Sequence, residues 1–495
     1  MRIRLLVLLL ATTLGLRSQN LFILGGELSN SAVTSVEDID EVMPRMKALG
    51  LNTVLVPAYW EFLEPEEGQF DYTLIDRTVL RARENGLKVV FLWFGAWKNS
   101  MSCYAPLWFK KDTRRFPRAK TKKGKTLEIA SCFSEEVFKA DNSAFGALMQ
   151  HLSQTAADVV TMIQVENEIG MLESARDHSP LANKAYDEPI PRMLYKTLNI
   201  SKPTTWRQLF GDDPYGEEKF MAYHYAKYVG RLCETARRYT QMPLYVNAAM
   251  NSRNRQPGQY PSAGPLAHLT DFWKAGAPQL LCLAPDIYDA GFKSWADRYA
   301  LPDNPLFIPE CHCTENSGAR AMYVFGEHHA LGFSPFAIDK APAKATENLA
   351  KAYNLLKQIV NSKLSNSTLS WGLLFDQQDK ERIIRDEDMS ITCRHYSTLP
   401  WSPQTTDGSE WPEGGAMLVK LDKHEYLLAG TGVVVRFGSE NGQIGIGSVD
   451  EVSIDEEGQT HYLRRNNGDE NHQGRHAQIA CGDWKILHIK LYTYK

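Results

Sequence analysis

Apolar and polar residues alternate in two different ways along this chain, and the change divides it into two regions. Over the first two thirds, short apolar runs precede stretches with an apolar residue at every third or fourth position, which is typical of strands followed by helices. Eight apolar runs recur, at residues 21–26, 52–59, 87–95, 159–165, 243–250, 279–288, 305–312 and 332–339. Helix-end signals fit this pattern: the segment 35–50 begins with Ser35, carries acids in its first turn and stops at Gly50.

Eight strand–helix repeats favour an α/β fold, the (β/α)8 TIM barrel. Strands joined by helices lie parallel with right-handed crossovers, and their apolar character indicates that both faces are covered. The rival architecture is an open, doubly wound sheet. That fold usually has a glycine-rich phosphate turn after its first strand, and GGEL at residues 25–28 does not match G-x-G-x-x-G. Two long insertions interrupt the repeat: a polar loop at about 99–139, and a second segment before the helix predicted at 217–239.

The apolar period shortens to two from about residue 369. The segments YLLAGTGVVVRFG, GQIGIGSVDEVSI and DWKILHIKLYTYK alternate in this way, with Gly and Asp at turns. We therefore predict a catalytic barrel over residues 20–365, followed by a smaller all-β sandwich domain over residues 366–495.

The first residues resemble a secretory signal peptide. Arg2 and Arg4 precede the apolar stretch 5–16, which is too short to span a bilayer comfortably. We expect residues 1–19 to be removed and the protein to be secreted or periplasmic. No later segment predicts a membrane span.

Composition narrows the class of partner. A net charge of −4 with 23% charged residues does not suggest a nucleic-acid binder, and 11% aromatic residues are compatible with stacking on sugars. Eight cysteines in 495 residues are not a disulfide framework, and the sequence leaves open whether Cys103 and Cys132 pair. No cofactor or metal is predicted: neighbouring residues on a strand point to opposite faces, so Cys311 and His312 diverge.

Catalytic residues of a barrel lie at the carboxyl ends of its strands, so we examined the polar residues where each apolar run stops. They are Glu27, Tyr59, Trp60, Glu61, Trp97, Lys98, Glu166, Asn167, Glu168, Asn247, Asp286, Tyr288, Glu310, His312 and Asp339. Glu168 and Glu310 stand out because they follow the fourth and seventh strands, which face each other across an eight-stranded barrel. Their carboxyl groups are expected within about 5–5.5 Å, the separation that retaining glycosidases use.

That chemistry needs two carboxyl groups in different protonation states. Glu168 is the predicted acid/base and Glu310 the predicted nucleophile, whereas the plain alternative is a pair of solvated charges. Among the neighbours, Asn167 is predicted to hold a sugar hydroxyl, Tyr288 to orient Glu310, and Glu166 to brace the site. Trp60 and Trp97 are predicted to contact substrate, although barrel packing explains them equally well, and Tyr59 is also predicted to contact it.

These residues resemble glycoside hydrolase clan A, with NE after the fourth strand and E after the seventh. Within the clan the chain most resembles family 35, the β-galactosidases, in a bacterial branch similar to family 42. VENEIG resembles the family's ENEYG segment, and PLWF at 106–109 its P-x-W-L stretch. The second-strand segment matches at Trp60, Glu64, Pro65, Gly68 and Phe70. Over residues 20–365 the resemblance implies a barrel, net retention, no metal and removal of non-reducing-end β-galactosides.

Two galactose contacts of that family are missing. The family's sugar-binding tyrosine falls on Pro57, with Tyr59 two residues on, and its A-E-W glutamate falls on Ala96, with Trp97 kept. We therefore predict a retaining glycosidase that removes terminal β-linked galactose from an oligosaccharide or polysaccharide. Two alternatives stay open: a clan A enzyme for a β-glucoside, β-xyloside or α-L-arabinoside, and a non-catalytic glycan-binding barrel.

Overall fold

The computed structural model of the protein describes residues 21–251, 254–362, 369–402, 407–439 and 442–494. The predicted signal peptide and the predicted boundary at 365/366 lie outside the described residues. Contacts divide the chain into two compact units: residues 1–47 with 52–311, and residues 48–51 with 312–495. None of the described helices is both long and apolar enough to cross a membrane.

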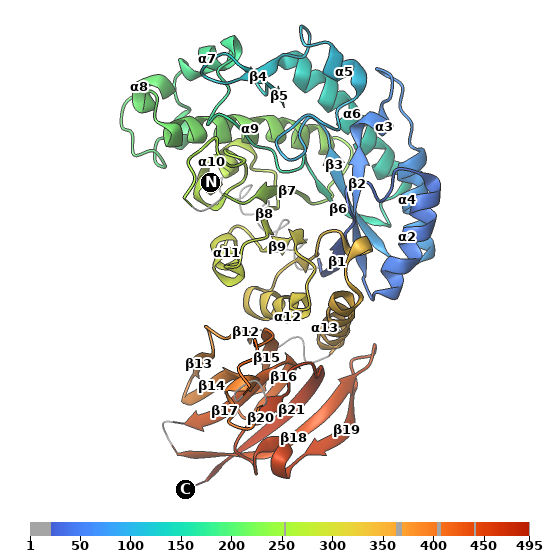
Figure 1. The fold of residues 1–495 in the computed structure, drawn as a ribbon, viewed down its shortest axis with the longest axis vertical. Coiled ribbons are helices and arrows are strands. Elements are labelled where there is room, and N and C mark those ends of the chain that lie inside the picture. Colours follow the sequence, from blue (N-terminus) through green and yellow to red (C-terminus); the bar gives the residue numbers. More distant parts are fainter. Residues whose placement is uncertain (1–20, 252–253, 363–368, 403–406, 440–441, 495) are drawn as a thin grey trace, which may run out of the picture. The chain divides into compact units, whose positions relative to one another are not determined.

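A sheet of short parallel strands forms the centre of the first region (Figure 1). Its order is β10–β8–β7–β6–β3–β2–β1–β11–β9, which is a nearly closed barrel as the sequence predicted. The predicted seventh strand is split by Pro309 into β9 (Phe307–Ile308) and β10 (Glu310–Cys311), and these halves occupy the two ends of the order. The other strands are β1 (Ile23–Glu27), β2 (Thr53–Tyr59), β3 (Lys88–Phe94), β6 (Val160–Gln164), β7 (Leu244–Ala249), β8 (Cys282–Ile287) and β11 (Gly332–Phe333).

Burial explains why these strands are almost wholly apolar. All seven residues of β2 are buried, as expected for a parallel strand covered on both faces. Figure 1 shows α2 (Val36–Ala48), α4 (Thr73–Glu84), α6 (Glu135–Thr155) and α9 (Pro214–Ala236) outside the sheet.

Side-chain caps fix the starts of these helices. The Ser35 hydroxyl accepts a hydrogen bond from Asp38 N at 3.1 Å, so the predicted cap of α2 is present. The predicted start of α9, at residue 217, is too late, and α6 begins inside the predicted loop at 99–139. In the structure the caps are Ser134, which accepts from Val137 N, and Asp213, which is followed by Pro214 in the first turn.

The predicted loop at 99–139 is wrong in part, because it contains regular structure. It holds α5 (Leu107–Lys111) and a hairpin of β4 (Arg118–Lys120) with β5 (Thr126–Ala130), and α6 begins within it. The second insertion carries α7 (Pro180–Tyr186) and α8 (Trp206–Phe210). The described part of the first unit also contains α3 (Trp60–Leu63), α10 (Thr270–Gly276) and α11 (Phe292–Tyr299). All eight cysteines are free, so Cys103 and Cys132 do not pair.

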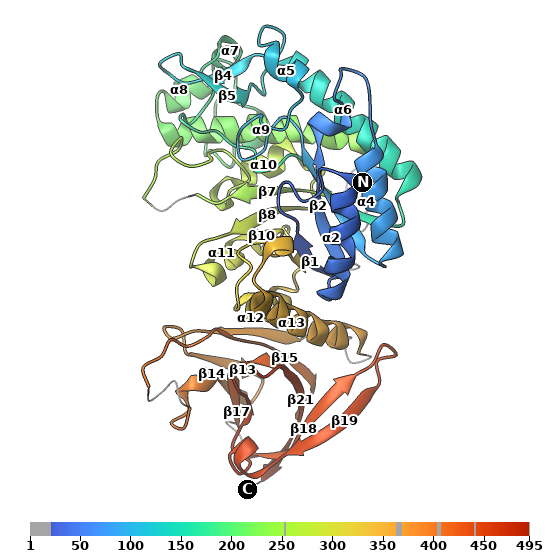
Figure 2. The same ribbon diagram turned by 45° about the vertical axis from the view of Figure 1, so that its right-hand side comes forward.

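The second unit contains α12 (Ser317–His328), α13 (Ala343–Asn361) and two antiparallel sheets. One sheet has the order β12–β15–β16–β21–β18–β19 and the other β13–β14–β17–β20. Figure 2 shows both sheets. Apolar side chains from each, such as Leu418 and Ile391, belong to one shared core. The strands are β12 (Ser370–Phe375), β13 (Glu381–Asp386), β14 (Met389–His395), β15 (Gly414–Asp422), β16 (Glu425–Thr431), β17 (Val433–Ser439), β18 (Gln443–Ile454), β19 (Thr460–Asn466), β20 (Ala477–Ile479) and β21 (Lys485–Tyr494).

Candidate active site

Four carboxyl groups meet at the carboxyl ends of the barrel strands. Glu27 ends β1, Glu168 follows β6, Asp286 lies near the end of β8 and Glu310 opens β10. All four are buried, with exposed fractions of 6% or less. Burying an ionised carboxyl group destabilises a fold unless the group is paired or protonated. Four of them together therefore indicate a functional site and exclude a set of solvated rim charges.

The predicted acid/base and nucleophile lie close together. Glu168, Asp286 and Glu310 each offer a carboxylate oxygen, and these three oxygens all lie within 4.8 Å of one another. Retaining glycosidases hold their two carboxyl groups about 5–5.5 Å apart, whereas inverting enzymes need about 6.5–9.5 Å to admit a water. The spacing of Glu168 and Glu310 therefore fits direct attack by one of them on the sugar.

Asn247 of β7 ties this cluster together. Its amide nitrogen lies 2.8 Å from Asp286 Oδ2 and 3.2 Å from Glu310 Oε1, and its amide oxygen accepts from Glu168 N at 2.9 Å. Tyr288 donates its hydroxyl to Glu310 Oε2 at 2.9 Å. Glu310 thus has a donor on each oxygen, an arrangement that holds an ionised carboxylate in one orientation.

The chain reaches Glu168 through an unusual turn. Strand β6 ends at Gln164, and Glu166 and Glu168 have left-handed φ values of 61° and 46°. Glu166 and Glu168 therefore do not continue the strand in an extended conformation. Left-handed glutamates are uncommon and cluster at functional sites. The turn is held because Asn99 donates to Glu168 Oε2 and Ser100 N donates to Glu168 O at 3.1 Å.

Burial and neighbouring negative charge dominate the electrostatics. Together with the Glu310 carboxylate, burial raises the pKa of Glu168 to about 7, while the charge of Lys98 acts in the opposite direction. The same two causes raise the pKa values of Glu27 and Asp286 well above the ordinary range. With one buried ammonium among four carboxyl groups, protons are retained on some of them at neutral pH.

Glu166 supports the site from behind. Its Oε2 accepts from Trp97 N at 2.8 Å, and its carboxyl group interacts with Asp141 of α6. Asp141 in turn accepts from Trp93 Nε1 at 2.9 Å and from the Tyr228 hydroxyl at 2.7 Å. These contacts place Glu166 in a bracing position, in contact with protein groups.

Asn167 is placed differently. Its side chain is fully buried between Glu166 and Glu168, and among the described residues neither its amide oxygen nor its amide nitrogen has a hydrogen-bond partner. Buried amides are normally satisfied, so an unpartnered pair of atoms beside the buried carboxyl groups is available to a polar ligand.

The predicted aromatic residues Trp60 and Trp97 pack against other aromatic side chains. Trp60 is buried at the start of α3, where it packs on Phe109 and donates to Glu64 Oε2 at 2.8 Å. Trp97 is buried against the edges of Tyr225 and Tyr228.

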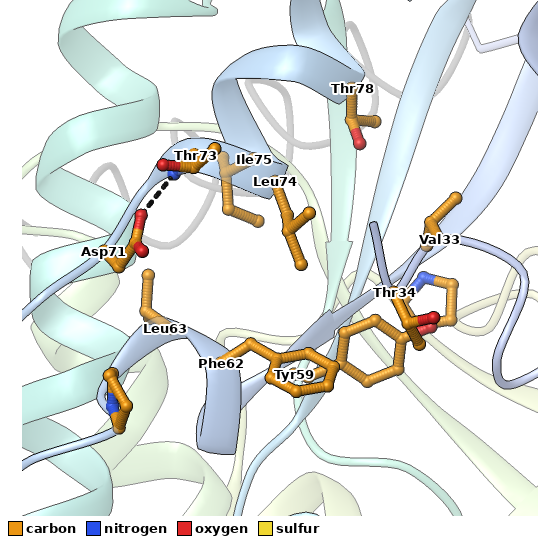
Figure 3. A pocket seen from close by; sticks show the side chains of 12 residues that line it. Val33, Thr34, Tyr59, Phe62, Leu63, Asp71, Thr73, Leu74, Ile75 and Thr78 are labelled. Atoms are coloured by element: carbon orange, nitrogen blue, oxygen red, sulfur yellow. Dashed lines mark hydrogen bonds between the residues drawn. The ribbon is translucent and has the colours of Figure 1, made fainter. Parts of the chain in front are cut away.

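Tyr59 lines a separate cavity of about 290 Å³, shown in Figure 3, beside Phe62 and the start of α4. Its hydroxyl donates to Asn30 O at 2.7 Å, so its polar end is already satisfied.

The carboxyl cluster also has the donor set for a metal ion, because it offers three oxygens within reach of one another. The surrounding groups do not fit a cation, however. Tyr288, Asn247 and Asn99 all direct hydrogen atoms at these oxygens, and a cation would have to displace them.

Sequence reasoning missed the contribution of Asn99, which it assigned to a loop. It noted Glu27, Asn247 and Asp286 as polar strand ends without giving them roles. A possible signal was their shared position, since every one of these three residues ends or nearly ends a barrel strand.

Comparisons with known proteins agree with this fold. A glycoside hydrolase family 42 model, described as beta-galactosidase, matches residues 31–210, and a domain of unknown function (DUF5597) matches residues 349–478. The first match includes Glu168 and stops before Glu310. No curated protein matches the sequence.

Three solved structures are similar to the chain, and each covers 68% of it. They are a beta-galactosidase from the psychrophilic Marinomonas ef1 (TM-score 0.50, 13% identity), one from the haloarchaeon Halorubrum lacusprofundi (0.45, 16%) and one from Bacillus circulans sp. alkalophilus (0.48, 14%). The chain spans 60%, 58% and 56% of their respective lengths. At these identities the similarity to the Marinomonas enzyme supports the barrel alone.

Proposed function

We propose that the protein is a retaining glycosidase that removes terminal β-linked galactose from a glycan. The observation that carries the proposal is the pairing of Glu168 with Glu310. Their oxygens lie within 4.8 Å, burial raises the pKa of Glu168 to about 7, and Glu310 is held by donors on both oxygens.

The first step forms a glycosyl-enzyme. A Glu310 oxygen attacks the anomeric carbon while Glu168 donates its proton to the glycosidic oxygen, whose bond to that carbon breaks and takes the electron pair. In the second step Glu168, now ionised, removes a proton from water. That water oxygen attacks the anomeric carbon and releases Glu310, so two inversions give net retention.

The sugar is the finer part of the proposal. The family 42 match over 31–210 supports galactose, and the resemblance of VENEIG and the second-strand segment to family 35 points the same way. Pro57 and Ala96 stand where family 35 has galactose ligands, which favours the second candidate, a related enzyme for a β-glucoside, β-xyloside or α-L-arabinoside.

A panel of aryl glycosides separates these outcomes. We expect the aryl β-galactoside to be cleaved with retention, observed by NMR of the first-formed sugar, and Glu310→Ala to abolish turnover. Cleavage of another glycoside in its place would contradict the assignment of galactose as the sugar, whereas the proposed mechanism would stand. Binding of glycans with no cleavage of any would support a non-catalytic barrel.

A matched control is Glu315→Ala, an exposed carboxylate just beyond the site whose partner Lys344 is also exposed. It should leave turnover unchanged. Azide should restore activity to Glu310→Ala and form a glycosyl azide whose anomeric configuration is opposite to that of the substrate. This result would identify Glu310 as the nucleophile.

A further inference from the structure

A second cavity, of about 570 Å³, opens in the first unit between segments that follow the barrel strands. Asn251, Asn254 and Arg255 come shortly after β7, which carries Asn247. Trp295 and Arg298 lie on α11, which follows β8 and its Asp286. Because both loops leave the carboxyl ends of their strands, this cavity belongs to the same rim as the carboxyl cluster.

The charged side chains that line this cavity are all positive. Arg255 and Arg298 line it, and no carboxylate does so among the described residues. Neither arginine has an ion-pair partner within the described part of the chain. Buried beneath the cavity, Glu218 is occupied: it accepts from the Tyr260 hydroxyl at 3.0 Å and contacts His268 Nε2 at 2.9 Å.

Many basic residues elsewhere in the described part of the chain have carboxylate partners. In the Lys- and Arg-rich segment 114–125, Arg115 lies 2.7 Å from Glu67 and Lys122 lies 2.9 Å from Asp212. Arg118 and Lys125 of that segment also have carboxylate partners, whereas neither arginine of the cavity forms an ion pair within the described residues.

Arg298 is held in place. Its guanidinium lies 4.5 Å from the centroid of the Trp295 ring, and that ring is 7% exposed. A guanidinium stacked on a fixed indole keeps its planar fork open for two parallel hydrogen bonds, the geometry that suits a carboxylate or a sulfate.

The remaining lining suits a sugar ring. Tyr215, near the start of α9, is 49% exposed and presents an aromatic face, and the amides of Asn251 and Asn254 offer donors and acceptors to hydroxyl groups. An aromatic face, neutral amides and two cations together match one chemical class, an anionic sugar.

We propose that this cavity binds an acidic sugar residue of the substrate, either a uronate or a sulfated sugar, away from the bond that is cleaved. The inference rests on the proposed function for the claim that this sugar belongs to the substrate. The binding itself depends only on the arginines and Tyr215, so the two can fail separately.

Calorimetry on the full chain tests the binding. The probes are digalacturonate, a sulfated galactose disaccharide and a neutral galactose disaccharide. We expect one or both acidic probes to bind more tightly than the neutral one, and the binding to weaken as NaCl rises. Preference for digalacturonate identifies a uronate, and preference for the sulfated probe identifies a sulfate ester.

Single variants locate the binding. Arg298→Ala and Arg255→Ala should each weaken acidic-probe binding roughly ten- to a hundredfold, as expected for loss of a charge-assisted contact. Arg238→Ala is the matched control, an exposed arginine just beyond the opposite end of α9, and should change nothing. Because Arg255 lies in an exposed loop, its variant guards against a folding defect in Arg298→Ala.

Two results would overturn the inference: equal affinity for acidic and neutral probes, or acidic binding that survives both substitutions. Turnover of the aryl β-galactoside, measured in parallel, distinguishes the proposals. Arginine-dependent binding without turnover would support the acidic-sugar site and contradict the proposed galactosidase activity. Turnover without binding of the acidic probes would support the galactosidase activity and contradict the acidic-sugar site.

Discussion

The acid/base role proposed for Glu168 requires it to be protonated, and this gives a direct test at the scale of one residue. Because its pKa is raised to about 7, the acid form is present below that pH and is lost above it. We expect kcat/KM to fall as the pH rises through about 7.

In Glu168→Gln that basic limb should disappear, and hydrolysis of glycosides with poor leaving groups should fall by about 10²–10⁴. Aryl glycosides with good leaving groups should lose far less in the first step. Persistence of the basic limb in the variant would assign it to another group.

Glu27 gives a prediction about stability. Its pKa is raised by burial and by Glu310, so the native state keeps a proton that the unfolded chain loses above about pH 4.3. Unfolding then releases this proton, and stability falls as the pH rises.

Glu27→Gln mimics the protonated form and should gain roughly 1–3 kcal/mol in free energy of unfolding at pH 8. The gain should vanish near pH 4, where both states are protonated. Urea denaturation at the two pH values measures it. A variant that is less stable only at pH 8 would instead show that Glu27 is ionised and paired with Lys98.

How much of the site is predictable differs from residue to residue. Glu168 and Glu310 follow from their position, because parallel strands deliver their carboxyl ends to one rim. The turn around Glu168 does not, since two glutamates in left-handed conformations contradict their usual preference. Asn99 was missed for a similar reason: its contact with Glu168 depends on how two loops meet.

At the scale of the elements, β3 and α6 meet where Gly95 leaves no room for a side chain. An added Cβ would lie 2.1 Å from Trp93 Nε1 and 2.8 Å from Asp141 Oδ1. The hydrogen bond between those two groups carries Asp141, which in turn contacts Glu166.

Gly95→Ala should therefore cost about 1–3 kcal/mol of stability and lower kcat, because the indole has to move and the turn at Glu168 loosens. Gly438→Ala is the control: the nearest atom to its added Cβ is Ser390 O at 3.6 Å, an ordinary contact. Thermal melts and kcat of the two variants decide. An unperturbed kcat in Gly95→Ala would mean that the turn does not depend on Asp141.

The wrong predictions of individual elements have physical explanations. Pro309 cannot donate to the ladder, and it divides the predicted seventh strand into β9 and β10. The hairpin of β4 and β5 lies among charged residues, so its short alternation in TLEIA was too weak to predict strands.

At the scale of the whole molecule, the second unit is built around backbone contacts of α12. An added Cβ at Gly372 would lie 2.2 Å from Tyr323 O, and one at Gly415 would lie 2.3 Å from Ala319 O. Strands β12 and β15 therefore cover α12 directly, and α12 begins only seven residues after Glu310.

A chain truncated after residue 362 should be insoluble or inactive, because it exposes the face of α12 that β12 and β15 bury. Gly415→Val in the full chain should lower Tm through the same contact. Expression yield, circular dichroism and aryl-glycoside turnover test both. A soluble, active truncated chain would show that the barrel folds without the β-sheets.

We expect the four buried carboxyl groups to bind small organic cations that can donate hydrogen bonds to them, unlike a metal ion. As the pH rises and protons leave the cluster, its negative charge grows, while a basic iminosugar such as a hydroxylated piperidine keeps its ammonium until about its own pKa. Inhibition by that compound should strengthen from pH 5 to pH 8, even as catalysis declines. A neutral lactone of the same sugar should show no such gain. The ratio of the two inhibition constants, measured across this pH range, would therefore report the charge of the site without turnover of any natural glycan.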